Sequence, residues 1–124
     1  MKSFGRDVGG AAALEFALTA PAFFAFIIGI ITTGLAIYAQ LALQHSVEMA
    51  ARCASVNTTT CSTTSEIQQY AVGQSYGLTT NTSTFSVTTP ACGNQVQANY
   101  VVSMNFGPIG TKSVTLTASS CFPK

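Results

Sequence analysis

The chain has 124 residues, of which 48% are hydrophobic and only 7% are charged, and its formal net charge is +1. An ordinary soluble domain has about 25% charged residues, and a net charge this small gives no basic field for nucleic-acid binding. The length allows one domain at most, plus an anchor. The hydrophobic residues are concentrated before residue 54, whereas the second half is rich in Thr, Ser, Asn and Gln.

Residues 16–39 carry no charged side chain and predict a membrane-spanning helix, which needs about 20 residues. A buried core helix is the alternative, but the rest of the chain is too small and too polar to surround one. A cleaved secretory signal is disfavoured, because its apolar region has about 7–15 residues. Lys2 and Arg6 precede the apolar run, and positive residues stay on the cytoplasmic side. We therefore expect residues beyond about 45 to lie outside the cytoplasm.

The apolar run belongs to one predicted helix over residues 11–54. Pro21 should kink this helix, because proline lacks the backbone N–H and clashes with the preceding turn. Over residues 40–54 the pattern becomes amphipathic, which predicts that the helix continues beyond the membrane. Small residues within the span form a row that lets helices approach closely in lipid. The residues that we assign to helix packing are Pro21, Ala25, Gly29 and Thr33.

Residues 55–124 predict a small head that begins with a short helix. Ser62 or Thr63 suits the N-cap, Glu66 lies in the first turn, and Gly77 is the predicted stop.

Three strands follow, because from Thr79 the apolar residues recur with period two. Gly107–Gly110 separates the last two strands and predicts a hairpin loop. The fold class is therefore α+β: a long N-terminal transmembrane helix that continues into a head with a short helix and a three-stranded antiparallel sheet. In the middle strand we expect Val96, Tyr100, Val102 and Met104 to pack on the helix. The opposite face would present Gln95, Gln97, Asn99, Val101, Ser103 and Asn105, either as a contact surface or simply to solvent.

Four cysteines lie in the part predicted to be outside the cytoplasm, and an even count in a small exported domain predicts disulfides. Three pairings are open. We favour Cys53–Cys61, which closes a short loop, and Cys92–Cys121, which brackets a predicted hairpin. A zinc site is disfavoured, because the chain has no C-x-x-C pair and His45 is its only histidine. We predict no metal and no cofactor.

We also predict no enzymatic activity. Glu48 and Glu66 occupy ordinary helix-surface positions, and His45 has no Asp or Cys partner for a catalytic triad. Glu15 differs, because it is the only charge in the long apolar run. A carboxylate at a bilayer centre costs about 2.5–3.5 kcal/mol, so an acid in such a run is a candidate functional residue. The alternative is that Glu15 only reaches the cytoplasmic interface.

The helical half contains a set of residues that occur together in one known family: Gly10-Ala-Ala-Ala-Leu-Glu15-Phe16, Pro21, Tyr38-Ala-Gln40, Leu43-Gln44 and Ala50-Ala51-Arg52. With these residues it resembles the class III prepilins, and specifically the TadE-like minor pseudopilins of the tight-adherence (Tad/Flp) pilus. The resemblance implies that a prepilin peptidase removes residues 1–10 by cutting between Gly10 and Ala11, so that Glu15 stands fifth in the mature chain. Such a carboxylate could pair with the freed α-amino group of a neighbouring subunit.

The resemblance implies a minor pilin or pseudopilin that takes part in assembly of a Tad/Flp-type pilus used in adhesion. The protein would be a single-pass protein of the bacterial inner membrane, with its N-terminus cytoplasmic and its head periplasmic, and would enter an extracellular pilus after assembly. Its partners would be the peptidase, other pilin subunits and the assembly platform. Two alternatives stay open: a signal-anchored periplasmic binding protein, and a pseudopilin of another secretion or DNA-uptake machine.

Overall fold

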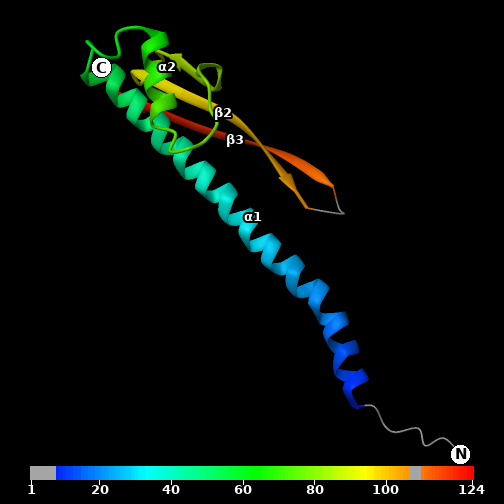
Figure 1. Ribbon diagram of the computed structural model, residues 1–124. Helices are drawn as coiled ribbons and strands as arrows, with labels where there is room; N and C mark the ends of the chain where they lie inside the picture. Colours follow the sequence, from blue (N-terminus) through cyan, green and yellow to red (C-terminus); the bar gives the residue numbers. More distant parts are fainter. Residues whose placement is uncertain (1–7, 107–109) are drawn as a thin grey trace, which may run out of the picture. The chain divides into compact units, whose positions relative to one another are not determined.

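The computed structural model describes residues 8–106 and 110–124 and has the predicted α+β layout (Figure 1). The chain divides into two compact units, Met1–Gly34 and Leu35–Lys124. We call the second of these the head unit; it contains the last part of the long helix together with all the remaining elements. In chain order the elements are α1 (Val8–Val56), α2 (Thr64–Gly73), the 3-10 turn η1 (Thr82–Thr84), β1 (Phe85–Thr88), β2 (Asn94–Asn105) and β3 (Thr111–Phe122).

The helix α1 is longer than the predicted range of 11–54, since it includes three residues before Ala11 and two after Ala54. It ends where Asn57 forms an Asx turn: the Asn57 side-chain oxygen accepts hydrogen bonds from the Thr59 hydroxyl at 2.7 Å and the Thr60 backbone N–H at 3.3 Å. This turn offers the backbone an alternative to the next helical hydrogen bonds. The chain therefore leaves the helix at the start of the Thr-rich segment.

The short helix α2 begins as predicted but ends earlier. Thr63 is the N-cap and forms a capping box with Glu66, whose carboxylate accepts from the Thr63 N–H at 3.0 Å. The prediction that Gly77 stops the helix is wrong, because α2 ends at Gly73. The Ser75 hydroxyl donates to the carbonyl of Val72 at 2.8 Å and so competes with continued helical bonding. Gly77 instead adopts a φ of +81° in the following turn.

The three strands form one antiparallel sheet in the order β1-β2-β3. The strands β2 and β3 form a long hairpin whose last described bond joins the Phe106 N–H to the Gly110 carbonyl at 3.0 Å. Residues 107–109 of the predicted hairpin loop lie outside the described residues. Along β2, the inward side chains from Val96 to Met104 are buried or half-buried, as the period-two pattern predicts.

A single core joins the C-terminal part of α1 to α2 and the sheet. Leu43 and Val47 of α1, together with Phe85 of β1, are among its largest fully buried side chains. Small residues allow the elements to approach closely within this core. The buried small residues are Ala50, Ala51, Ala71, Ala98 and Ala118.

Two disulfides link the head, and they are the pairs that the sequence favours. Cys53–Cys61 joins the last turns of α1 to the loop before α2, with a Cα–Cα distance of 5.9 Å. Cys92–Cys121 joins the β1–β2 loop to the end of β3, at 6.3 Å. Next to the second bond, Gly93 has a φ of +126°, and a side chain there would collide with the carbonyl oxygen of Phe122. Glycine is therefore required at this position.

Candidate functional site

The first unit consists of the N-terminal part of α1, whose large apolar side chains are exposed. Phe16 and Leu18 are 70% and 73% exposed, and Phe26 is 68% exposed. Only 6% of the most apolar 18-residue window of this helix is buried, so in the described chain it is not the core helix of a globular domain. It is the one helix of the described residues that is long and apolar enough to cross a membrane, by length and composition.

Glu15 lies in this exposed segment, one turn before Thr19. Its neighbours Leu14 and Phe16 are 64% and 70% exposed, so the carboxylate stands in an apolar surface. The Thr19 hydroxyl donates to the Glu15 backbone carbonyl at 3.0 Å. That bond satisfies the hydroxyl within the helix and leaves Glu15 as the one charged side chain on the part of this unit that the structure describes, residues 8–34.

The predicted cleavage bond, between Gly10 and Ala11, lies inside α1. Both residues are exposed, and a Cβ built on Gly10 meets nothing within 4 Å. The bond is therefore not covered by another element of the described chain. Cleavage here would place the new α-amino group at the start of a helix.

The small-residue row, Ala25, Gly29 and Thr33, is open along α1. A Cβ built on Gly29 meets nothing within 4 Å, and the Thr33 hydroxyl donates to the Gly29 carbonyl at 2.8 Å. Because this bond satisfies the threonine, the row presents an apolar strip suited to close helix packing. Pro21 lies within the same helix, and the kink that it predicts stays a prediction.

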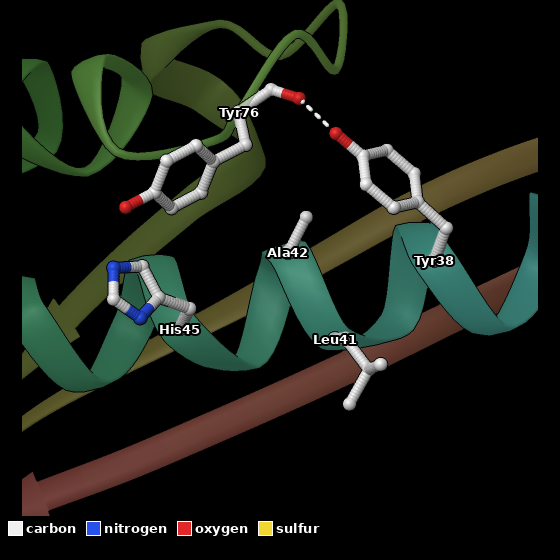
Figure 2. A pocket seen from close by; sticks show the side chains of 5 residues that line it. All are labelled: Tyr38, Leu41, Ala42, His45 and Tyr76. Carbon is white, nitrogen blue, oxygen red and sulfur yellow. Dashed lines mark hydrogen bonds between the residues drawn. The ribbon is translucent and has the colours of Figure 1, made fainter.

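In the head unit, an aromatic groove lies where α1 passes the turn after α2, and Figure 2 shows its side chains. The Tyr38 hydroxyl donates to the Tyr76 carbonyl at 2.6 Å, and the His45 and Tyr76 rings have centroids 5.1 Å apart. The groove has a volume of about 330 Å³. We call it the tyrosine groove; it is lined by Tyr38, Leu41, Ala42, His45 and Tyr76.

The backbone of Tyr76 has a φ of +44°, which a non-glycine residue adopts at a cost of about 1–3 kcal/mol. The hydrogen bond from Tyr38 and the ring contact with His45 hold this residue in place. Sequence reasoning missed the groove. The only signal was the helical spacing of Tyr38, Ala42 and His45, and nothing in the sequence places Tyr76 beside them.

The outward face of β2 is polar, as predicted. Gln97, Asn99 and Ser103 are exposed, as is Val101 at 62%. Gln95 is half-buried, and its side chain accepts from the Thr88 hydroxyl at 3.3 Å. We call the exposed set the polar β2 face; its members are Gln97, Asn99, Val101, Ser103 and Asn105.

Charged groups are few in the head unit. The Glu66 carboxylate accepts from the Ser62 hydroxyl at 2.6 Å, and this bond, with those from Thr63, lowers the pKa of Glu66. These contacts cap α2. Over residues 8–106 and 110–124, no three His, Cys, Asp or Glu side chains gather as metal ligands would.

The described residues thus form one helix able to span a membrane and a small disulfide-linked α+β head. Residues 10–52 match the family described as TadE-like protein. The match confirms the predicted resemblance to TadE-like proteins, whereas the prepilin signal stays a prediction. The match lies within α1, includes Glu15 and the small-residue row, and stops one residue before Cys53. No match was found among curated proteins or among solved structures.

Proposed function

We propose that this protein is a minor pilin or pseudopilin, anchored in the bacterial inner membrane and used in the assembly of a Tad/Flp-type pilus. The observation that carries the proposal is the exposed apolar surface of α1 within a segment that matches the TadE-like family. A subunit of this kind needs one surface that is stable first in lipid and then among other helices. The exposed phenylalanine and leucine side chains suit both environments, and the small-residue row favours the second.

Glu15 gives the assembly step its specificity. In lipid an isolated carboxylate is costly, so a cationic partner stabilises it strongly. The α-amino group that cleavage after Gly10 frees on a neighbouring subunit is such a partner, because both groups lie near the start of the mature helix. The pair would form where helices exclude water, and there the Coulomb attraction is larger than in bulk water.

In this proposal the N-terminus is cytoplasmic and the head is periplasmic, since Lys2 and Arg6 precede the span. The two disulfides support the assignment of the head, because disulfides persist in oxidising compartments. The prepilin peptidase, other pilin subunits and the assembly platform are the partners. The head acts in binding and assembly, including adhesion, and has no catalytic role.

Processing of Gly10→Leu tests the proposal. The intact mass and N-terminal sequence of the parent, extracted from membranes of a strain with the peptidase, should begin at Ala11. Gly10→Leu should keep residues 1–10 and stay in the membrane. Gly9→Leu is the matched control, because it makes the same change one residue from the cut and should mature normally. Retention of the leader by the parent would contradict the proposal and would favour a signal-anchored periplasmic protein.

A further inference from the structure

The tyrosine groove stands at the place where the apolar helix enters the head. Tyr38 is one residue from the end of the predicted span at residue 39, and no formally charged residue occurs between Phe16 and Val47. The apolar character of the span therefore continues along α1 into the groove. Nothing charged separates the two surfaces along the helix.

The groove is open and apolar although it belongs to a folded unit with a buried core. Tyr38 is 52% exposed, Leu41 is 66% exposed and Tyr76 is 61% exposed. Large hydrophobic side chains with these exposures normally lie singly on a soluble surface, and a contiguous group indicates a contact. Tyrosine suits one particular contact, since its ring is apolar and its hydroxyl is polar, and it is enriched at the boundary between lipid and water.

The turn that carries Tyr76 positions it for such a boundary. Tyr76 is held against α1 beside Tyr38 by three features. These are its positive φ, its ring contact with His45 and the hydrogen bond from the Tyr38 hydroxyl. In Figure 2 the Tyr38 and Tyr76 side chains lie on the same side of α1, above Ala42. The rings of Tyr38 and Tyr76, which are 38 residues apart in the sequence, thus lie together beside the helix.

We propose that the tyrosine groove rests in the bilayer that holds α1, with its aromatic rings at the junction of the acyl chains and headgroups of the periplasmic leaflet. The inference rests on the proposed membrane anchoring. It adds which face of the head unit meets the bilayer and how deep that face lies. The occupant of the groove is a phospholipid acyl chain. Recognition needs no anionic lipid, because no lysine or arginine lines the groove.

The chain contains no tryptophan, so a single Trp reports on one position of the intact protein. Tyr76→Trp and Leu41→Trp place the reporter in the groove, and the second keeps the test valid if the first does not fold. The matched control is Val56→Trp, which lies at the other end of the head on the same helix and is 70% exposed in the parent. Phe26→Trp reports separately on the span. Each full-length variant is reconstituted into two sets of phosphatidylcholine vesicles. One set has acyl chains brominated near the headgroup and tests the groove reporters, and the other has acyl chains brominated near their methyl ends and tests Phe26→Trp, which lies in the middle of the predicted span.

The groove reporters should lose much of their emission to bromine quenching and shift to shorter wavelength, whereas Val56→Trp should be quenched little. Added salt or anionic lipid should not change the result. If Phe26→Trp is quenched but both groove reporters behave like Val56→Trp, the groove is not in lipid and the inference is overturned, while membrane anchoring stands. If Phe26→Trp is also unquenched, the membrane anchoring itself fails.

Discussion

The Ser46 hydroxyl donates a 2.7 Å hydrogen bond to the carbonyl oxygen of Ala71, and both residues are fully buried. This bond joins α1 to α2 inside the core. A serine between Leu43 and Val47 on the buried face of an otherwise apolar helix is costly unless it finds a partner. The partner lies 25 residues away, so the bond forms only when α2 is seated on α1.

Replacement of Ser46 by alanine should lower the free energy of unfolding of the head unit by about 0.5–1.5 kcal/mol, the usual net value of one hydrogen bond. The loss stays small because the Gln74 backbone N–H also donates to the Ala71 carbonyl, at 3.1 Å, and keeps it satisfied. Denaturant unfolding in detergent micelles measures this loss in the free energy of unfolding. Gln44→Ala, an exposed change on the same helix, should stay within about 0.5 kcal/mol of the parent. If Ser46→Ala changes the free energy of unfolding no more than Gln44→Ala does, the Ser46–Ala71 hydrogen bond does not stabilise the head unit.

The two disulfides should differ in their contribution to stability. Their sequence separations are 8 and 29, for which loop entropy gives about 2.5 kcal/mol for Cys53–Cys61 and about 3.6 kcal/mol for Cys92–Cys121. Paired Cys→Ala variants, unfolded under the same conditions, measure both losses. Cys53 and Cys61 are buried, so a larger loss for their pair would show that packing of the sulfur atoms outweighs loop entropy.

Stability should fall at acidic pH through Glu66. Hydrogen bonds from Ser62 and then Thr63 hold the folded pKa of Glu66 below its ordinary value of 4.5. Because the folded pKa is the lower one, this stabilisation is complete above about pH 4.5 and is lost as the pH falls through the folded pKa. Glu66→Gln should flatten the dependence of the unfolding midpoint on pH in this window. If the unfolding midpoint of Glu66→Gln depends on pH as steeply as that of the parent, the assignment to Glu66 is wrong.

The periodic elements were predictable, because burial on one face imposes a repeat on the sequence. The alternation from Val96 to Met104 fixes both the strand and its inward face, and the long apolar run fixes α1. The end of α2 was not predictable from Gly77, because a hydroxyl of Ser75 competes for the last carbonyls. The tyrosine groove was also beyond prediction, since its Tyr38–Tyr76 contact depends on tertiary packing over 38 residues.

Loss of the Glu15 charge should impair assembly without impairing the fold. Glu15→Gln should be processed, inserted and disulfide-bonded like the parent, because Glu15 lies in the first compact unit and is exposed. An ion pair at about 4 Å contributes about 1 kcal/mol in water and more where water is excluded, so incorporation into fibres should fall at least about fivefold. Thr19→Ala, one turn away, is the control and should assemble normally. Immunoblots of sheared fibres measure incorporation, and a parental level for Glu15→Gln would reduce Glu15 to an interfacial residue.

The polar β2 face should be a contact surface in the assembled fibre or with the surface to which it adheres. Gln97 and Asn99 are exposed and face away from the core, so the double variant Gln97→Glu/Asn99→Glu should keep the fold and both disulfides. At a contact, two buried and unpaired carboxylates would each cost several kcal/mol, so assembly or adhesion should be largely lost.

Gln44→Glu/Gln69→Glu is the matched control, because it adds the same two charges at exposed positions on α1 and α2, away from this face. Circular dichroism and non-reducing peptide maps test the fold of both variants, and fibre yield and attachment to a surface test the function. Loss of function only in the β2 variant would support the contact. If the β2 variant assembles and adheres like the parent and the control, the polar β2 face is solvated, and the contacts of the head lie on another surface.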